Sequence, residues 1–255
     1  MLVVVGCGTV VPEPGTGGSS FWADLDGTRA LIDCGPGAVQ ALARLDLPWP
    51  EMTDLVLTHF HADHIGALPG LFFSLTHGLA PAVRTAPLDV WGPPGTNDLM
   101  TGLARVLGSF VLDPGFEVRV HEIEPGQQVH MPSGADLMSF KTPHTTESQA
   151  VRISSPVGSI GYSGDTGPCP ELGDFMHHVD VLVCECSLTD DLVGDNHLSP
   201  TGVARIASRA EPGELVITHV YPHVREAHDV VALIRDQGYD GRVSLASEGL
   251  QVPLS

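Results

Sequence analysis

The stretch THFHADHIGAL, which begins at Thr58, holds the densest set of metal-ligand side chains in the chain. His59, His61, Asp63 and His64 fall within six consecutive positions, directly after the apolar run LVL. Imidazole and carboxylate are the groups that zinc and similar divalent cations bind in proteins. A polar loop with surface histidines is the alternative, and four such residues between strand and helix signals disfavour it. The spacing predicts two pairs of ligands, one pair for each of two adjacent metals.

Three further ligand-type residues follow predicted strands, where α/β scaffolds present their functional loops. They lie in the segments KTPHTTES (His144), GYSGDTGP (Asp165) and LVITHVYP (His219). An aspartate can bridge two metals, so a seven-residue set emerges. The predicted set has His59, His61 and His144 on one ion, Asp63, His64 and His219 on the other, and Asp165 between them.

The elements that must position these side chains are short β-rich runs that alternate with helical patterns. We predict strands at 2–5, 19–25, 29–33, 55–58, 88–91, 118–123, 127–130, 136–141, 150–154, 158–163, 179–184, 214–218 and 242–245. We predict helices at 37–45, 66–76, 96–107, 200–210 and 224–237. Strand clusters followed by helices favour two sheets packed face to face with helices outside. The turn-rich connections are short, so we expect one α/β domain over residues 1–255.

Charge and cysteine usage narrow the class of protein. The formal net charge is −19, and Lys141 is the only lysine. Proteins that grip long nucleic acid usually present a basic face, so a large polyanionic partner is disfavoured, although a patch of Arg84, Arg105, Arg119 and Arg152 stays open. Five scattered cysteines without a C-x-x-C pair indicate reduced thiols. With no charged leader and no apolar run long enough to span a membrane, we expect a soluble cytoplasmic protein.

These motifs together resemble the metallo-β-lactamase fold, and most closely its ribonuclease Z-like phosphodiesterase branch. THFHADHIGALPGL, TPHTTESQAVRI, YSGDTGP and ITHVYP occur in the family's order, and VVVGCGTVVP, LIDCGPG and VWGPPGT are similar to its early and mid-chain turns. The resemblance runs over nearly the whole chain. It implies an αββα sandwich with a dinuclear metal site at one edge of the two sheets. Because relatives that share the fold also act on thioesters, lactams and lactones, the fold alone does not identify the substrate.

The segment VLVCECSLTDDLVGDNHLSPTGVARIA is similar to the part of ribonuclease Z in which a glutamate supports a histidine at the scissile phosphate. The resemblance implies that Glu185 holds His197, which steadies or protonates the leaving oxygen. In the alternative interpretation, His197 is a polar residue before a helix capped by Ser199, and Glu185 is a carboxylate at a strand end.

Two departures from ribonuclease Z separate this chain from tRNA processing. Only 21 positions separate His144 from Asp165, which leaves no room for the long arm that clamps tRNA. The segment after His219 reads VYPHVREAHD rather than the Phe-Ser-x-Arg-Tyr pattern. The sequence therefore resembles the armless relatives, several of which hydrolyse cyclic nucleotides or small phosphodiesters.

We therefore predict a phosphodiesterase of small phosphodiesters or cyclic nucleotides, with two divalent cations and a metal-bridging hydroxide. Zn²⁺ is favoured and Mn²⁺ is the alternative. Asp63 is expected to orient the hydroxide besides ligating, while His197 and Glu185 complete the catalytic set. Ribonuclease Z-type tRNA 3′ processing, a lactonase or thioesterase activity, and a metal-holding sensor are the alternatives. We expect no membrane partner, and since relatives are often dimers, a homodimer is an open possibility.

Overall fold

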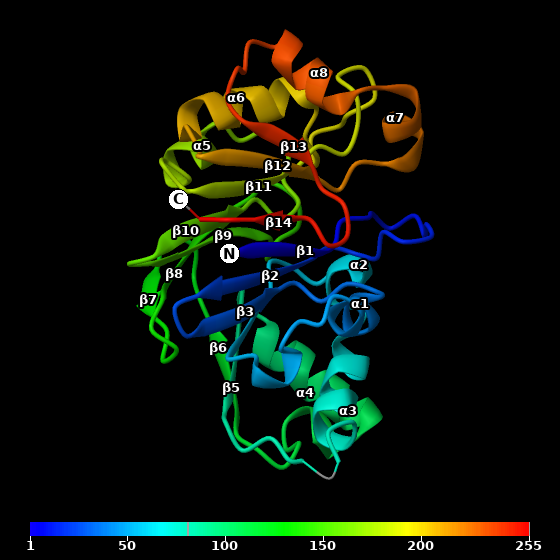
Figure 1. Ribbon diagram of the computed structural model, residues 1–255, viewed down its shortest axis with the longest axis vertical. Coiled ribbons are helices and arrows are strands. Elements are labelled where there is room, and N and C mark those ends of the chain that lie inside the picture. The colour runs from blue at the N-terminus through cyan, green and yellow to red at the C-terminus, as the bar shows by residue number, and fades with distance from the viewer. Residues whose placement is uncertain (81, 255) are drawn as a thin grey trace.

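The computed structural model describes residues 1–80 and 82–254, and it has two seven-stranded sheets packed face to face (Figure 1). The first sheet has the order β14-β1-β2-β3-β4-β5-β6. Its strands are β1 (Leu2–Gly6), β2 (Ser20–Leu25), β3 (Thr28–Ile32), β4 (Asp54–Val56), β5 (Leu88–Gly92), β6 (Val118–Glu122) and β14 (Gln251–Val252).

The second sheet follows in the sequence and has the order β13-β12-β11-β10-β9-β8-β7. Its strands are β7 (Gln128–His130), β8 (Asp136–Lys141), β9 (Gln149–Ser155), β10 (Gly158–Tyr162), β11 (Val181–Glu185), β12 (Glu214–Thr218) and β13 (Val243–Leu245). The first half of the chain thus forms the first sheet and the second half forms the second sheet. Strand β14 is the exception among the described strands, since it returns from the C-terminal end to pair antiparallel with β1.

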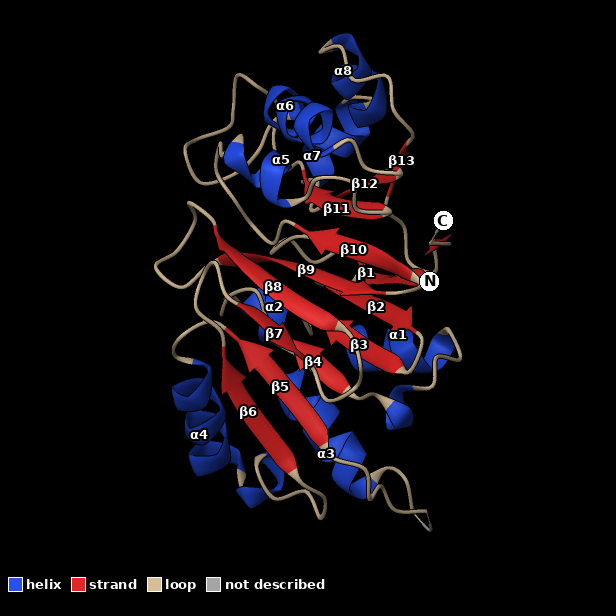
Figure 2. Ribbon diagram, turned by 90° about the vertical axis from the view of Figure 1, so that its left-hand side faces the viewer, coloured by secondary structure: helices blue, strands red, loops and turns tan. Residues whose placement is uncertain are grey.

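Helices cover the two outer faces, with α5 to α8 at one end of the view and α1, α3 and α4 at the other (Figures 1 and 2). They are α1 (Ala38–Arg44), α2 (Ala62–Ile65), α3 (Leu68–His77), α4 (Thr96–Leu107), α5 (Glu171–Phe175), α6 (Pro200–Ala210), α7 (Pro222–Ala227) and α8 (Val230–Asp236). Two 3₁₀ turns lie at Trp49–Glu51 and Ser109–Val111. The predicted αββα sandwich is confirmed.

The alternation of side chains along each strand explains the layers. In β1, Leu2 and Val4 face the core between the sheets, whereas Val3 packs against the helices of the first sheet. In β11, Val181 enters the same central core and Leu182 enters a third core under α5 and α6. Because successive side chains point to opposite faces, a strand buried on both faces reads as a continuous apolar run such as MLVVV.

Each sheet contains a run of parallel strands, β3 to β6 in the first sheet and β10 to β13 in the second. Parallel strands in one sheet end at the same edge, so the loops that leave them gather there. The loops after β4, β10, β11 and β12 carry most of the residues that the sequence predicts as ligands or catalysts.

The structure corrects two predicted helices. The segment 224–237 forms α7 and α8, separated by an extended His228, because Asp229 accepts a hydrogen bond from the Ala232 amide and caps a new helix. The segment 66–76 is not one helix from Gly66: α2 already contains Asp63 and His64, and α3 begins separately with proline in its first turn. Strand β14 and helix α5 were not predicted, since each is very short. Within the described residues, no helix combines the length and apolar character needed to cross a membrane.

Candidate metal centre

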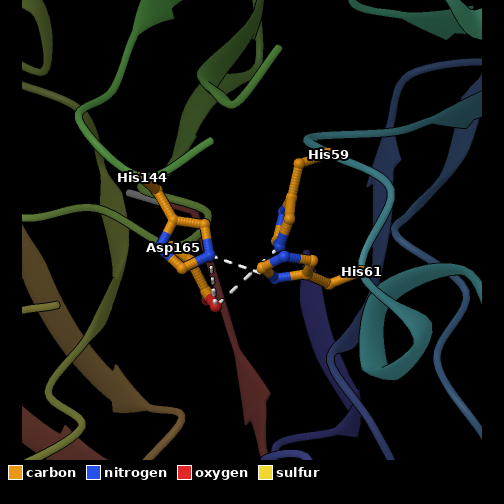
Figure 3. Close-up of side chains that lie close together, drawn as sticks. All are labelled: His59, His61, His144 and Asp165. Atoms are coloured by element: carbon orange, nitrogen blue, oxygen red, sulfur yellow. Dashed lines mark hydrogen bonds and ion pairs between the residues drawn. The ribbon is translucent and has the colours of Figure 1, made fainter. Parts of the chain in front are cut away.

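Seven ligand-type side chains meet at the edge where the two sheets end. His59 and His61 follow β4 and approach from one side, while His144, in the β8–β9 loop, and Asp165, after β10, approach from the other (Figure 3). The others are Asp63 and His64 in α2 and His219 directly after β12. Among the described residues, two groups in this set place one ligand atom of each member within 4.8 Å of the rest; they are His59, His61, His144 and Asp165, and Asp63, His64 and His219.

Asp165 lies between these two groups. Its Oδ1 is 3.3 Å from His64 Nε2, and its Oδ2 is 3.5 Å from His219 Nε2 and 3.6 Å from His144 Nε2. His59 Nε2 lies 3.9 Å from the same Oδ2. One carboxylate therefore faces nitrogen atoms of both groups, which is the arrangement required of a ligand shared by two cations.

The polar atoms at this centre fit bound cations. His59 Nε2, His64 Nε2 and Asp165 Oδ1 are buried without a hydrogen-bond partner among the described residues. Buried polar atoms are nearly always paired, so three orphans that converge on one point indicate a missing partner. His61 Nδ1 and His144 Nε2 also face each other at 3.1 Å. A nitrogen and oxygen donor set of this kind suits divalent metal ions.

Hydrogen bonds behind the rings orient two of the buried histidines. Asp33 Oδ2 accepts the Nδ1–H of His64 at 2.7 Å and also the hydroxyl of Thr58 at 2.8 Å. Because that hydroxyl donates to Asp33, it accepts the Nδ1–H of His59, 3.1 Å away. Both imidazoles thereby direct Nε2 toward the centre, and Nε2 is the nitrogen that a metal would bind.

Hydrogen bonds at Nδ1 also orient the two histidines contributed by the second sheet, His144 and His219. The carbonyl of Asn196 lies 2.7 Å from His144 Nδ1 and accepts its proton. Ser187 donates its hydroxyl to Glu185 Oε2 at 2.6 Å, so its oxygen accepts the Nδ1–H of His219 at 3.0 Å. Asp33, Thr58, Asn196 and Ser187 are positioning residues to which the sequence analysis gave no role. The LIDCGPG turn was the one signal for them, since it places an aspartate directly after a parallel strand.

The electrostatics of the centre favour a positive charge. Burial opposes ionisation of Asp165, but His219, His64 and His59 outweigh it and hold the pKa of this carboxyl well below its ordinary value. Burial lowers the pKa of His64, yet Asp165 and Asp33 raise that pKa well above the usual value. Burial lowers the pKa of His59 to about 2, which keeps this ring neutral. The carboxylates of Asp165 and Asp33 therefore favour either a proton or a metal ion at His64 Nε2, and the two compete for this nitrogen.

His197 lies beside the ligands on the loop between β11 and α6. Its Nδ1 is 3.0 Å from Glu185 Oε1, and its ring lies 4.9 Å from the ring of His144. Burial lowers the pKa of His197, but the Glu185 carboxylate, followed by Asp165 and Asp63, raises it above its ordinary value. The fully buried Glu185 also accepts the amide of Thr166 at 2.7 Å, so the carboxylate is fixed by both strand and loop.

His197 can also be read as a ligand, since one of its ring nitrogens lies within 4.8 Å of ligand atoms of Asp165 and His219. A cavity of about 330 Å³ opens over the centre. Five of the seven ligand-type residues line it, together with Val10, Ala62, Asn196, His197 and Tyr221. Cys186, near Glu185 in the sequence, is fully buried in the core beneath α6.

A family model described as "Beta-lactamase superfamily domain" matches residues 28–220. An uncharacterised Mycobacterium leprae protein is 34% identical, covering 97% of this chain and 86% of its own length. A ribonuclease Z of Haloferax volcanii is 26% identical, covering 98% and 94%. The solved structure of the metallo-beta-lactamase fold protein YhfI from Bacillus subtilis superimposes with a TM-score of 0.80 at 22% identity, covering 98% of this chain and 96% of that one.

Proposed function

The chain belongs to the β-lactamase superfamily and is a metal-dependent hydrolase related to ribonuclease Z, and within this class we propose that it hydrolyses small phosphodiesters, cyclic nucleotides among them. The observation that carries the proposal is His197, held by the buried Glu185 at the rim of the ligand cluster with a raised pKa. Because Glu185 favours the protonated form of this imidazole, the site suits an anionic substrate better than a neutral lactone.

We propose two ions, with Asp165 as their shared ligand. His59, His61 and His144 would hold one, and Asp63, His64 and His219 the other. When bound, such ions supply Lewis-acid polarisation of the phosphoryl oxygens and an acidified water. Zn²⁺ suits a set of five imidazoles and two carboxylates best, and Mn²⁺ is the alternative.

The chain's own groups supply the proton transfers. Burial opposes ionisation of Asp63, but the hydrogen bond from His219 outweighs it and lowers the pKa of this carboxyl to about 2. Asp63 is thus an anion that can accept a hydrogen bond from the attacking water and orient it. His197, protonated and held at Nδ1 by Glu185, donates its Nε2 proton to the leaving oxygen. Asn196 and Ser187 keep His144 and His219 in the orientation that this geometry needs.

Two of the four arginines that could form a nucleic-acid patch are already engaged with the protein's own backbone. Arg84 is buried and donates to the backbone carbonyls of Pro50 and Met52, and Arg152 donates to the carbonyls of Phe175 and His177. These two side chains are therefore engaged with backbone carbonyls. Arg119 pairs with Asp89 at 2.9 Å, which leaves Arg105 as the exposed member of the patch. The open groove on the His144 side of the centre is lined by Glu147 and Asp195, and such acidic walls repel a polyphosphate chain.

Ribonuclease Z-type processing is the second candidate, and the 26% identity to a ribonuclease Z over almost the whole chain favours it. Zinc- and manganese-loaded protein should be assayed on bis(p-nitrophenyl) phosphate, 2′,3′- and 3′,5′-cyclic nucleotides, pre-tRNA, a lactone and a thioester. We expect turnover of the small phosphodiesters to exceed turnover of the lactone and thioester. Turnover restricted to a lactone or thioester would overturn the proposal.

The salt dependence separates the two phosphodiesterase candidates. The net charge of −19 repels a substrate with many phosphates, mainly at low ionic strength where screening is weakest. We therefore expect catalytic efficiency on cyclic nucleotides to exceed that on pre-tRNA, with a gap that narrows as salt is added. Tight pre-tRNA binding that weakens as salt rises would instead reveal a basic docking surface and favour tRNA 3′ processing.

We also propose a cytoplasmic location, a homodimer and a single domain over residues 1–255. The free cysteines support the first, since reduced thiols suit the cytoplasm. Fractionation and size-exclusion chromatography with light scattering test the location and the oligomeric state.

A further inference from the structure

The loop between β8 and β9 (142–148) brings His144 to the metal centre. The two strands pair antiparallel as far as Lys141 and Gln149, and the loop begins directly after this pair. From the loop, the ring of His144 points toward His61 and Asp165 (Figure 3). Within the described residues 142–148 there is no helix or strand, so hydrogen bonds of another kind must fix the position of His144.

Lys141, the last residue of β8 and the only lysine of the chain, supplies three of these hydrogen bonds. Its Nζ donates to the carbonyl oxygens of Thr142 at 2.9 Å, Thr145 at 2.6 Å and Ser148 at 3.0 Å. A lysine ammonium has three N–H donors, so all of them are used within the loop. The carbonyls come from both sides of His144, and one cation therefore ties the start, the middle and the end of the loop together.

Neutral hydrogen bonds also close the loop. The amide of His144 donates to the Thr142 carbonyl at 3.1 Å, and the amide of Thr145 donates to the Ser148 hydroxyl at 3.1 Å. Hydrogen bonds from a charged donor are roughly twice as strong as neutral ones. The ammonium of Lys141 is therefore expected to contribute most to the conformation of this loop.

Binding of the substrate phosphate is the alternative role for a lysine beside such a centre. Lys141 lines the open groove that also contains His144 and Asn196. Its N–H donors are already paired, however, and each would have to leave a carbonyl oxygen before it reached a phosphate. Because an abandoned carbonyl costs free energy, the hydrogen bonds favour a role in positioning over a role in substrate binding.

We propose that Lys141 is a positioning residue of the metal centre, whose ammonium holds the β8–β9 loop in the conformation that brings His144 to an ion shared with His59 and His61. These three histidines are here called the histidine site. The inference rests on the two ions of the proposed function and adds a residue that ligates neither of them. Lys141 acts through His144, so its loss should affect the histidine site and not the site of Asp63, His64 and His219.

Zinc affinity measured for each site tests the proposal without any reaction. Lys141→Met keeps most of the apolar stem and removes the ammonium. The full-length protein is titrated with Zn²⁺ against a chromogenic chelator, and His61→Ala identifies the step that belongs to the histidine site. We expect Lys141→Met to weaken that step about tenfold, the lower end of the effect of groups that support a metal ligand, and to leave the other step unchanged. Equal weakening of both steps, or of neither, would overturn the proposal.

Arg152 provides a matched control for a general loss of stability. It lies on β9, and its Nη1 donates to the carbonyls of Phe175 at 3.2 Å and His177 at 3.0 Å, neither of which belongs to the ligand set. Arg152→Met thus also removes a cation that ties backbone carbonyls together. Thermal unfolding of the metal-free proteins compares the two losses of stability. We expect Arg152→Met to leave both zinc steps unchanged, and weakening of the histidine site as large as in Lys141→Met would contradict a specific role of the lysine.

Rescue by an added amine tests the ammonium itself. Lys141→Ala removes the equivalent of a propylammonium ion, so propylammonium should restore the weakened zinc step. Tetramethylammonium carries the same charge but has no N–H donor, and it should restore nothing. Lys141→Arg should stay weakened, since a planar guanidinium does not direct three donors from one nitrogen. Equal responses to the two cations would show that hydrogen bonds from Lys141 do not position the loop.

The failure of this inference and the failure of the proposed function are distinguishable. A wild-type protein that binds a single Zn²⁺ would reject the proposed pair of ions. A wild-type protein that binds two, with both steps unchanged in Lys141→Met, would retain the pair and reject the positioning role. If Lys141→Met then raises KM for bis(p-nitrophenyl) phosphate, Lys141 contacts the substrate and the alternative role is correct.

Discussion

The two ligand groups of the centre differ in how they are enclosed. All three residues of the inner group (Asp63, His64 and His219) are buried. The outer group (His59, His61 and His144) contains the exposed His61. Behind the inner group stands the buried Asp33, and behind the outer group His144 is held by a backbone carbonyl. A carboxylate behind an imidazole fixes the ring and makes it a stronger ligand. We therefore expect an ion at the inner group (Asp63, His64, His219) to bind more tightly than one at the outer group (His59, His61, His144), with Asp165 serving both.

The largest effect should come from removing the shared residue. Asp165→Ala removes the carboxylate that faces both groups, so both should lose metal and hydrolysis should fall below detection. Metal analysis after gel filtration, combined with the phosphodiester assay, measures both losses. Two full metal equivalents in an active Asp165→Ala protein would show that Asp165 is not the bridge and that the two groups act separately.

His197→Ala tests whether His197 is a proton donor outside the two ligand groups or a metal ligand itself. If His197 is a proton donor, the variant keeps both metals and loses roughly 10²–10⁴ in rate, the usual effect of one general acid. Metal content and kcat on bis(p-nitrophenyl) phosphate are measured on the same preparation. Loss of metal would make His197 a ligand beside Asp165 and His219. An unchanged rate would make it only the polar residue before α6.

Asp33→Asn should weaken the inner group more than the outer group, because Asp33 contacts His64 directly and reaches His59 only through the Thr58 hydroxyl. Asparagine keeps the shape but loses the charge that orients His64 and strengthens it as a ligand, so metal affinity there should fall by about 10–100-fold. Asp89→Asn is a matched control. Asp89 is a buried carboxylate on β5 that pairs with His121 of β6 at 2.7 Å, and neither residue belongs to the ligand set. Competitive titration with a chromogenic chelator should show that Asp33→Asn weakens one metal-binding step more than the other, and that Asp89→Asn weakens neither step. Equal weakening in both would indicate a general loss of stability.

The ligand-type residues were predictable because they stand at strand ends with strong local signals. The motif from His59 to His64 is contiguous, and His144, Asp165 and His219 each follow a strand of high β propensity. The order of the strands within each sheet was not predictable from the chain alone, since β14 pairs with β1 from the opposite terminus. Pairings of that kind depend on packing in three dimensions rather than on local pattern.

The positioning residues show the same limit. Ser187 is an ordinary serine in the sequence, and its place between Glu185 and His219 appears only when β11 and β12 lie side by side. The predicted helix 224–237 was wrong because its apolar spacing continues across Asp229, whose side chain caps α8. Capping is decided by one side-chain hydrogen bond, which competes locally with the helical pattern.

The smallest expected effect is a displacement of a pH profile, and it isolates the link between Glu185 and His197. Burial lowers the pKa of His197, and the Glu185 hydrogen bond and charge more than reverse this. A raised pKa keeps the ring protonated to higher pH, so activity that needs the proton is lost only as pH rises through that raised value. Glu185→Gln removes the charge, lowers the pKa of His197 and should move the basic limb of the kcat profile to lower pH.

His197→Ala provides the background for this measurement, because the limb that belongs to His197 is absent there. Glu185 also accepts from Ser187, so its substitution can disturb His219, and metal content must be measured in parallel. With both metals retained, a basic limb at lower pH in Glu185→Gln supports a proton donor tuned by a buried carboxylate. A limb that stays in place would mean that the pH dependence comes from the ligand groups themselves. His197 would then act through position alone, and the distinction between the ligand groups and a separate proton donor would disappear.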